Sequence, residues 1–390
     1  MLIQKGFKYK LLPTKEQEKK FLQCGGNTRF VWNLFLKQNI SYYKETKKFK
    51  FFYELATSLP KLKQEYPFLK KSYAQSLQMV AKQFDRALKD SFKREKGFPV
   101  FKKKSLLNDS FAYLQNWRLG KGFIFIPKIG EVKWIKNRAL KGKPKSITIS
   151  QDGNKWYCSV LCEYEIDDKE KKFDNIIGCD LGLKEFAVFS DGTIISNPKT
   201  LKKYEVKLAK EQRRLSKKQK NSNNRFKQRM KVRKVYTKIK NVRQDFLHKT
   251  TSSMIAKYDG VVLENLNVIG MMKNHYLAKY IADVSWSEFR RQLEYKCRWN
   301  FKHFILIDRF EPTSKVCSEY GCIQDMPLDK RQFNCLDCGI SINRDLNASI
   351  NIRNLGLRTL GQSGIACGVE TFLNNETGKR MSGKPDRCFL

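Results

Sequence analysis

Hydrophobic and polar residues in the first part of the chain follow the periods of a β-domain that is interrupted by helices. Residues 6–12 alternate as in a half-buried strand, and Pro13-Thr14 then breaks the alternation and caps a helix over residues 15–43. A second helix is predicted over residues 73–94, where apolar side chains recur at helical spacing, namely Leu77, Val80, Phe84 and Leu88.

Short β-type runs follow these helices. The sequences GFIFI, SITIS and WYCSVLCEY are rich in β-branched and aromatic residues and are separated by turn signals such as Asp152-Gly153. We therefore predict a small β-barrel or sandwich. Because a strand precedes the helices and more strands follow them, the helices are predicted to be an insertion into the β-domain.

The second half of the chain alternates between buried strands and helices. Apolar runs predict strands over residues 175–180, 186–190, 193–196, 260–264 and 304–308, and helices over residues 286–299 and 343–356. Asp191-Gly192 is a dipeptide typical of a two-residue type I′ hairpin. Gly356 is the predicted helix stop, and the chain beyond Leu357 has the composition of a loose tail.

The net charge of the chain predicts that the protein binds nucleic acid. Against 38 acidic residues stand 78 Lys and Arg, a formal charge of +40. A compact fold with this charge repels itself unless a polyanion neutralises it, and nucleic acid is the obvious polyanion. A/T-biased codons or a solvated surface would raise Lys, but neither would reduce Asp and Glu to half the number of bases.

Composition also excludes other classes. Hydrophobic residues make up 41% of the chain, so disorder of the whole chain is excluded. No run approaches the roughly 20 apolar residues of a spanning helix, and residues 1–10 are not a signal peptide. We expect a soluble intracellular protein with no membrane partner.

The basic charge is concentrated in one stretch. Residues 199–243 hold 19 Lys or Arg and two Glu, in a helical composition interrupted at residues 221–224. Two basic helices are predicted. A solvated hairpin is the alternative, but like charges at this density destabilise an isolated helix, and a bound phosphate backbone would relieve them. The predicted backbone contacts are Arg213, Arg214, Lys217, Lys218, Arg229 and Arg233.

Polar residues on the helix at residues 73–94 form a second candidate nucleic-acid contact. Gln75, Gln78 and Lys82 lie on one side of this helix, and Gln can bond adenine in a bidentate way at a groove edge. An ordinary exposed polar face explains the same residues.

Three carboxylates form a candidate catalytic site. Two apolar strands end in Asp180 and Glu264, and the last helix opens with Asp345. Hard divalent cations prefer carboxylate oxygens, so this set predicts a site for paired Mg²⁺ (or Mn²⁺) ions that hydrolyses phosphodiester bonds. Taken singly, each has another explanation: Asp180 could cap a turn, Glu264 could pair with a Lys, and Asp345 could be an N-cap.

Four of the eleven cysteines are clustered. The odd total and this clustering fit a reducing compartment and a metal site better than a disulfide framework. The candidate Zn²⁺ ligands are Cys317, Cys322, Cys335 and Cys338, with a metal-free ribbon as the alternative. Cys158, Cys162 and Cys179 fall on apolar strands and are predicted to be small core residues.

Two other chemistries find no support. His248, His275 and His303 are not near a Ser or Cys nucleophile signature, which argues against acyl transfer. The chain has no P-loop, which argues against ATP-driven helicase activity.

At the carboxylates the chain closely resembles the TnpB family, the proteins encoded by insertion-sequence transposons that are related to compact type V CRISPR effectors. The motifs are GCDLGLKEFAVFSDG with Asp180, VVLENL with Glu264 and NRDLNASINI with Asp345. The segments YLAKYIADVSWSEFRRQLEYK, EPTSKVCS, FKYKLLPTKEQE, NTRFVWN and GFPVFKKK are also similar to the family. The resemblance covers most of the chain.

The resemblance implies a multidomain α/β protein. The implied first domain is a β-barrel wedge domain (residues 1–12 and 98–172) that carries a helical recognition insert (13–97). The implied second domain is a RuvC-like nuclease domain of RNase H fold (173–310 and 340–357), which contains the basic hairpin and an inserted zinc ribbon (311–339). A flexible tail (358–390) would follow. It also implies an RNA-guided DNA endonuclease in the cytoplasm of a prokaryote, associated with the nucleoid. Its partners would be a guide RNA derived from the transposon end and a double-stranded DNA target with a short flanking motif, with no small-molecule substrate.

Two positions depart from the family pattern. Asn343 stands where the third motif usually begins with Asp, and we take Asp345 as the metal ligand there. In CSEYGC, Tyr320 occupies the usual second zinc-ligand position and Cys322 follows two places later, so four thiolates remain available.

Two alternative functions stay open. A protein of the same ancestry could use a guide RNA to occupy DNA as a repressor with weak or no nuclease activity. A transposase, or a transposase accessory protein, would use similar carboxylates to join DNA ends.

Overall fold

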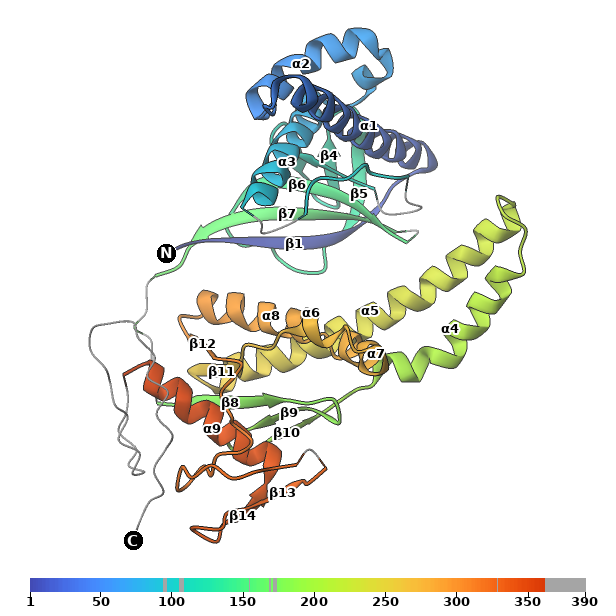
Figure 1. The fold of residues 1–390 in the computed structure, drawn as a ribbon. Helices are drawn as coiled ribbons and strands as arrows, with labels where there is room; N and C mark the ends of the chain where they lie inside the picture. The colour runs from blue at the N-terminus through green and yellow to red at the C-terminus, as the bar shows by residue number, and fades with distance from the viewer. Residues whose placement is uncertain are drawn as a thin grey trace. The chain divides into compact units, whose positions relative to one another are not determined.

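The protein is described by a computed structural model that covers residues 1–93, 97–104, 109–153, 155–167, 170, 174–327 and 329–361. Within these residues the chain is a mixed α/β protein that divides into two compact units (Figure 1). The first comprises Met1–Lys169 and Tyr204–Asn241, and the second comprises Glu170–Lys203 and the chain from Val242 onward.

The first unit is built on a seven-stranded antiparallel sheet with the strand order β2-β6-β7-β1-β5-β4-β3. The strands are β1 (Leu2–Leu12), β2 (Ser110–Tyr113), β3 (Arg118–Leu119), β4 (Phe123–Ile126), β5 (Gly130–Ile135), β6 (Lys143–Asp152) and β7 (Lys155–Glu165). The strand predicted at residues 6–12 and the three predicted β-type runs are confirmed within β1, β4, β6 and β7. The predicted turn at Asp152-Gly153 joins β6 to β7.

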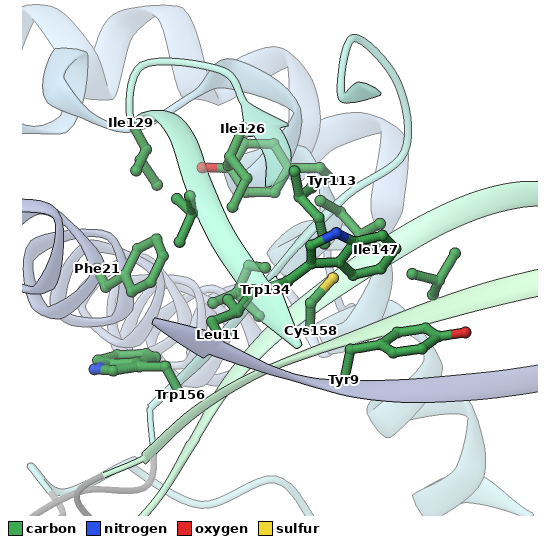
Figure 2. Close-up of a cluster of buried hydrophobic side chains, with 14 of the residues drawn as sticks. Tyr9, Leu11, Phe21, Tyr113, Ile126, Ile129, Trp134, Ile147, Trp156 and Cys158 are labelled. Carbon is green, nitrogen blue, oxygen red and sulfur yellow. The ribbon is translucent and has the colours of Figure 1, made fainter. Parts of the chain in front are cut away.

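Side chains from both ends of this sheet meet in one core (Figure 2). The Tyr9 and Trp134 rings pack edge to face with centroids 4.7 Å apart. Cys158 is fully buried within the core, which confirms its predicted role as a small core residue, and Cys162 is buried as well. All seven strands belong to one hydrogen-bonded sheet, and the choice between a barrel and a sandwich stays a prediction.

Three helices lie between β1 and β2 in the chain: α1 (Lys15–Thr46), α2 (Phe52–Glu65) and α3 (Ala74–Phe92), with a 3-10 turn η1 (Pro67–Lys71) after α2. Thr14 caps α1 as predicted, since its hydroxyl accepts from the Gln17 N–H while the Gln17 side chain accepts from the Thr14 N–H. The predicted apolar positions of α3 are buried against α1 and α2. The sequence did not predict α2, because its apolar residues span a short stretch that contains Pro60.

The basic stretch forms the two predicted helices, α4 (Thr200–Ser216) and α5 (Asn223–Lys257). Polar contacts close this hairpin at its turn: the Arg225 guanidinium donates to the carbonyls of Leu215 and Lys218, and the Gln228 amide donates to the Glu211 carboxylate at 2.6 Å. The hairpin is therefore an ordered antiparallel pair that still presents most of its Lys and Arg to solvent.

The second unit is built on a five-stranded sheet with the order β10-β9-β8-β11-β12. The strands are β8 (Ile176–Leu181), β9 (Glu185–Phe189), β10 (Ile194–Ser196), β11 (Gly260–Glu264) and β12 (His303–Ile307), which confirms all five predicted strands. The first three pair antiparallel, whereas β8, β11 and β12 pair parallel. In their order along the chain, the five strands therefore lie in the sheet as 3-2-1-4-5.

Helices cover both faces of this sheet (Figure 1). Odd positions of the central strands, such as Ile177 and Leu263, pack against α5, α7 (His275–Val284) and α8 (Trp286–Trp299). Even positions such as Ile176 and Val262 pack against Ile352 of α9 (Arg344–Thr359). Both faces of the sheet are therefore buried, which explains the continuous apolar runs in β8 and β11. Cys179 is fully buried among them, as predicted.

Two local predictions are wrong. The turn after β9 is a three-residue loop rather than a type I′ hairpin: Phe189 N–H donates to the Thr193 carbonyl, and only Gly192 (φ 82°) is left-handed, whereas Asp191 is not. Gly356 does not stop α9, which continues to Thr359. An added Cβ at Gly356 would lie 2.5 Å from a Val262 methyl, so close packing accounts for this glycine. The predicted tail thus begins no earlier than Leu360, and residues 362–390 lie outside the described residues.

Among the helices of the described residues, none combines the length and apolar character that crossing a membrane requires.

Candidate active site and metal centres

The sheet of the second unit brings Asp180 and Glu264 to the same edge. The parallel strands β8 and β11 pair with Cys179 opposite Leu263, and each carboxylate is the next residue along its strand. Because parallel strands end at the same edge, the two carboxylates stand side by side although 84 positions separate them in the chain.

Helix α9 carries Asp345 to this edge. An added Cβ at Gly178 would lie 2.1 Å from the Ser349 carbonyl, so glycine is required where α9 crosses β8. Asn343 caps the helix, since its side-chain oxygen accepts from the N–H groups of Asp345 and Leu346. Asp345 is therefore not the N-cap, and Asn343 performs that function as well as Asp would.

The surroundings of Asp180 disfavour its ionised form. Burial, together with the neighbouring charges of Glu264 and Asp345, raises the pKa of Asp180 to about 7. Burial also raises the pKa of Glu264, although a hydrogen bond from Thr313 opposes this shift. Like charges held together in this way are stabilised by a cation between them.

The carboxylates do not form as tight a group as the cysteines described below. Among the described residues, only cysteine-containing groups have three or more ligand atoms within 4.8 Å of one another. A site for two ions roughly 3.5 to 4 Å apart spreads its ligands over a larger volume than a one-ion site does. Asp180, Glu264 and Asp345 therefore do not offer three oxygen atoms within 4.8 Å of one another.

A chain of hydrogen bonds holds Glu264 from the segment after β12. The buried Thr313 hydroxyl donates to Glu264 Oε1 at 2.7 Å. The Asn351 amide of α9 donates to the carbonyls of Thr313 (2.8 Å) and Val316 (2.7 Å), and Asn347 bonds the same segment through Val316 and Ser318. The helix that carries Asp345 thus also fixes the residue that orients Glu264.

The four cysteines lie on two turns of the same form. In the first turn, the Tyr320 N–H donates to Cys317 Sγ at 3.4 Å and Gly321 (φ 78°) follows. In the second, the Cys338 N–H donates to Cys335 Sγ at 3.5 Å and Gly339 (φ 71°) follows. Tyr320 therefore occupies the place that Cys338 has in the second turn.

Cys322 brings the fourth thiol to the cluster. Its sulfur lies 3.3 Å from that of Cys335, and the sulfur of Cys317 lies 3.6 Å from that of Cys338. Tetrahedral zinc with bonds of about 2.3 Å places its sulfurs roughly 3.8 Å apart. Burial opposes ionisation of Cys335, but hydrogen bonds to its sulfur outweigh burial and lower its pKa to about 7. Cys317, Cys335 and Cys338 could hold a metal ion, as could Cys322, Cys335 and Asp337, and both groups share the Cys335 thiol.

The ribbon around these cysteines is small. A hairpin of β13 (Gln332–Asn334) and β14 (Ser341–Asn343) supports it, and Met326 and Phe333 bury against the thiols. Cores of this size are commonly stabilised by a bound metal.

The predicted nucleic-acid contacts differ in their surroundings. Arg213, Arg214, Lys217, Lys218 and Arg229 are exposed on the hairpin, whereas Arg233 is half-buried. Gln78 and Lys82 are exposed on α3. The Gln75 side chain makes two hydrogen bonds within the protein: its amide nitrogen donates to the Gln115 side chain, and its amide oxygen accepts from the Gln115 N–H.

The sequence did not predict the residues that position Glu264. Thr313, Asn347 and Asn351 are buried and polar, and the two asparagines are four residues apart on a helix face that packs against the protein. Polar residues at buried helical positions are the signal that could have identified them.

Three family models match the chain. Residues 159–275 match OrfB_IS605, described as a probable transposase, and residues 286–352 match the Cas12f1-like TNB domain. Residues 1–48 match a helix-turn-helix domain, although the structure has one strand and one long helix there.

Relatives match along most of the chain. A "Putative RNA-guided DNA endonuclease" of Streptomyces pristinaespiralis is 32% identical and covers 91% of this chain and 90% of its own length. "Putative RNA-guided DNA endonuclease InsQ" of Escherichia coli K12 is 32% identical over 93% of each chain. Among solved structures, a Cas12f1-sgRNA-target DNA complex matches 90% of this chain with a TM-score of 0.57 at 15% identity, which shows a shared fold. With relatives of this identity and coverage, the chain belongs to the TnpB family of OrfB-type, transposase-associated proteins.

Proposed function

We propose that this protein is an RNA-guided DNA endonuclease that hydrolyses a guide-matched DNA target by RuvC-like, two-metal-ion catalysis. The observation that carries the proposal is the position of Asp180 and Glu264 at one edge of the sheet, with Asp345 carried there by α9; burial first, and then the charges of Glu264 and Asp345, raise the pKa of Asp180 to about 7. A carboxylate group with this degree of mutual repulsion suits a cation site better than a structural ion pair.

The sheet topology supports a RuvC-like domain. The order 3-2-1-4-5, with a carboxylate at the end of the first and fourth strands and a third on a covering helix, is the arrangement expected of an RNase H-like nuclease. The two strand ends provide rigid positions, and Thr313 fixes the rotamer of Glu264.

Each residue has a distinct role in this proposal. Asp180, Glu264 and Asp345 would hold Mg²⁺ or Mn²⁺, whose chemistry is to activate water and to stabilise the leaving oxygen of the phosphodiester. Cys317, Cys322, Cys335 and Cys338 would hold a structural Zn²⁺ that has no open position for substrate. Thr313 positions Glu264, and Asn351 positions Thr313.

The partners follow from charge and from the relatives. Two relatives carry the words RNA-guided DNA endonuclease in their names, and the chain has 40 surplus positive charges. We infer a guide RNA from the transposon end and a double-stranded DNA target with a short flanking motif. The sheet and helices of the first unit would serve as wedge and recognition parts, and the exposed bases of the hairpin would bind nucleic-acid backbone.

Co-purification tests the dependence on a guide. Protein expressed with its native flanking DNA should carry one discrete RNA, and this complex should cut a DNA that matches the RNA in the presence of Mg²⁺. Protein that purifies without RNA, and cuts nothing when the transcribed flanking RNA is added back, would refute the proposal.

Charge reversal tests the hairpin. Replacing Arg213, Arg214, Lys217, Lys218 and Arg229 by Glu should weaken RNA or heteroduplex binding and reduce the slope of log affinity against log salt by about 0.7 to 0.9 for each phosphate that is no longer neutralised. Exchanging Lys217 and Lys218 for Arg keeps the charge and should leave the slope unchanged. An unaltered slope in the reversed variant would remove the hairpin from the interface.

A further inference from the structure

A hollow of about 240 Å³ lies beside Glu264 in the second unit. Its walls come from the ends of β8 and β11, from α6 (Val268–Met271) and from the start of α8. Leu181, which follows Asp180, and Leu263, which precedes Glu264, both line it. The hollow is therefore part of the same sheet edge as the carboxylates, although none of the roles described above uses it.

The lining of this hollow is apolar with a few polar groups. Leucine side chains, Val268 and Trp286 form the walls, and Ser287 and Arg290 add a hydroxyl and a guanidinium. The Arg290 guanidinium is held by a 2.7 Å hydrogen bond to the Asn265 side chain. An apolar wall with a small number of fixed polar groups is the usual composition of a site for a small organic group.

Trp286 forms part of the apolar wall. The residue is 3% exposed, and its Nε1–H is buried without an acceptor among the described residues. Because a water molecule cannot reach this N–H, it does not face the hollow, and Trp286 contributes to the site only the surface of its ring.

We propose that this hollow receives one unpaired nucleobase of the DNA strand that is cut at the neighbouring carboxylates, with Trp286 as part of its apolar wall. This inference rests on the proposed nuclease function and adds a substrate-positioning site to it. Three observations favour a base over other parts of the nucleic acid.

Size is the first. Pockets for drug-sized ligands span roughly 300 to 1,000 Å³, so a hollow of about 240 Å³ suits a single planar ring system rather than a longer segment. Charge is the second, because the lining holds one carboxylate, Glu264, and one guanidinium, Arg290, so a neutral base meets no net charge inside the hollow. Aromatic and apolar lining is the third, because every base presents a face that packs on such surfaces.

The start of α8 suits the rest of the same nucleotide. Helix α8 has 14 residues, and its N-cap Ser285 makes no side-chain capping bond. The N-terminus of a helix attracts anions, so the phosphate next to an inserted base would be favoured there, near Ser287 and Arg290. A base held in the hollow would thus fix the register of the strand at the carboxylates, which is how positioning accelerates a reaction.

Filling the hollow tests the proposal. Val268→Trp places a large side chain in the hollow and leaves all three carboxylates in the chain, and Ile269→Trp makes the same change at the adjacent residue, which is 80% exposed and does not line the hollow. The probes are an oligo(dT) strand and an abasic strand of equal length, with Ca²⁺ in place of Mg²⁺ to prevent cutting. We expect the wild type and Ile269→Trp to bind the strand with bases better, and Val268→Trp to lose about tenfold of that preference.

Trp286→Phe is the second variant, since it replaces the indole of the wall by a smaller ring. It should weaken the preference for bases about threefold because the base loses part of its packing surface, and circular dichroism at the assay temperature checks that the variant is folded. An unchanged preference for bases in both Val268→Trp and Trp286→Phe would overturn the proposal. So would a preference that appears with oligo(U) and its abasic counterpart but not with the DNA pair, because that result would assign the hollow to RNA.

A cleavage scan separates this proposal from the proposed function. A single abasic nucleotide is moved stepwise through a guided target, and one position near the cut should slow the wild type and Ile269→Trp about tenfold but leave Val268→Trp insensitive. If no guided target is cut at all, the nuclease function fails, and the binding comparison above still decides whether the hollow receives a base.

Discussion

The carboxylate centre and the cysteine cluster lie in the same structural unit, but their ligands are held in opposite ways. The thiols lie on two local turns, with sulfur atoms of facing residues 3.3 and 3.6 Å apart. The carboxylates come from β8, β11 and α9, and are not gathered within 4.8 Å of one another. Thiols in the neutral form tolerate contact, whereas carboxylates repel one another until cations arrive.

This difference suggests different roles for the two sites. A closed group of four thiols stabilises a fold that is too small to be stable alone, and it leaves no open position for substrate. In the proposed function, the wider carboxylate group on rigid strand ends would hold two ions and a phosphate. Single substitutions should therefore affect catalysis at one site and stability at the other.

Removing one carboxylate should have the largest effect. Asp180→Asn, Glu264→Gln and Asp345→Asn are each expected to lower the rate of guided DNA cleavage by at least about a thousandfold, because metal ligands act as a unit. Binding of the same DNA, measured by gel shift, should change by less than about twofold. Asp308→Asn is the control, since Asp308 is an exposed carboxylate that follows the neighbouring parallel strand β12. If Asp345→Asn cuts at the wild-type rate, the third ligand is misassigned.

Removing one thiol should act on stability and metal content instead. The wild type should contain about one zinc ion per chain, and Cys322→Ser should lose most of it, together with several degrees of melting temperature. Elemental analysis and thermal melting measure both. Cys158→Ala, a core cysteine of the first unit, should destabilise the protein but keep its zinc. Full zinc content in Cys322→Ser would show that Cys322 is not a ligand.

A rescue sharpens the zinc assignment. Because the Tyr320 N–H already bonds Cys317 Sγ as the Cys338 N–H bonds Cys335 Sγ, a cysteine at position 320 meets the same geometry as Cys338. Tyr320→Cys combined with Cys322→Ser is therefore expected to regain zinc. The single variant Cys322→Ser is the reference, and failure of the double variant would contradict the equivalence of the two turns.

Thr313 connects the two sites and should have an intermediate effect. Thr313→Val keeps the shape of the side chain but removes the 2.7 Å hydrogen bond to Glu264, so we expect about a tenfold lower cleavage rate and a higher Mg²⁺ concentration at half-maximal rate. Thr313→Ser retains the hydroxyl and should restore both values. A purely structural loss would instead lower the melting temperature without changing the Mg²⁺ dependence.

The pH dependence of stability should show the smallest effect. The pKa of Asp180 is raised from 3.8 to about 7, so the folded state binds this proton more tightly than the unfolded state does. Stability from this group is complete below about pH 4 and is lost as the pH rises through about 7. Mg²⁺ binds the ionised carboxylates, so the gain in melting temperature on adding Mg²⁺ should grow by a few degrees between about pH 6 and pH 8. Asp180→Asn should flatten this dependence, and a wild-type gain that falls with pH would contradict it.

Local patterns in the sequence predicted most elements. The apolar runs predicted the five strands of the second unit, and Thr14 predicted the start of α1, because strand and helix periods and caps are properties of a few neighbouring residues. Prediction failed where a distant contact overrides the local signal. Gly356 looks like a helix stop, yet it is a glycine because α9 packs on Val262 there.

Residue type and net charge do not depend on folding, so they were enough to specify the candidate ligands and the need for a polyanion. How those ligands meet could be learned only from the folded chain. The parallel pairing of β8 with β11 places Asp180 beside Glu264, and Gly178 allows α9 to bring Asp345 to the same edge. Only the folded chain shows that Thr313, Asn347 and Trp286 are buried, and a buried polar group generally requires a hydrogen-bond partner.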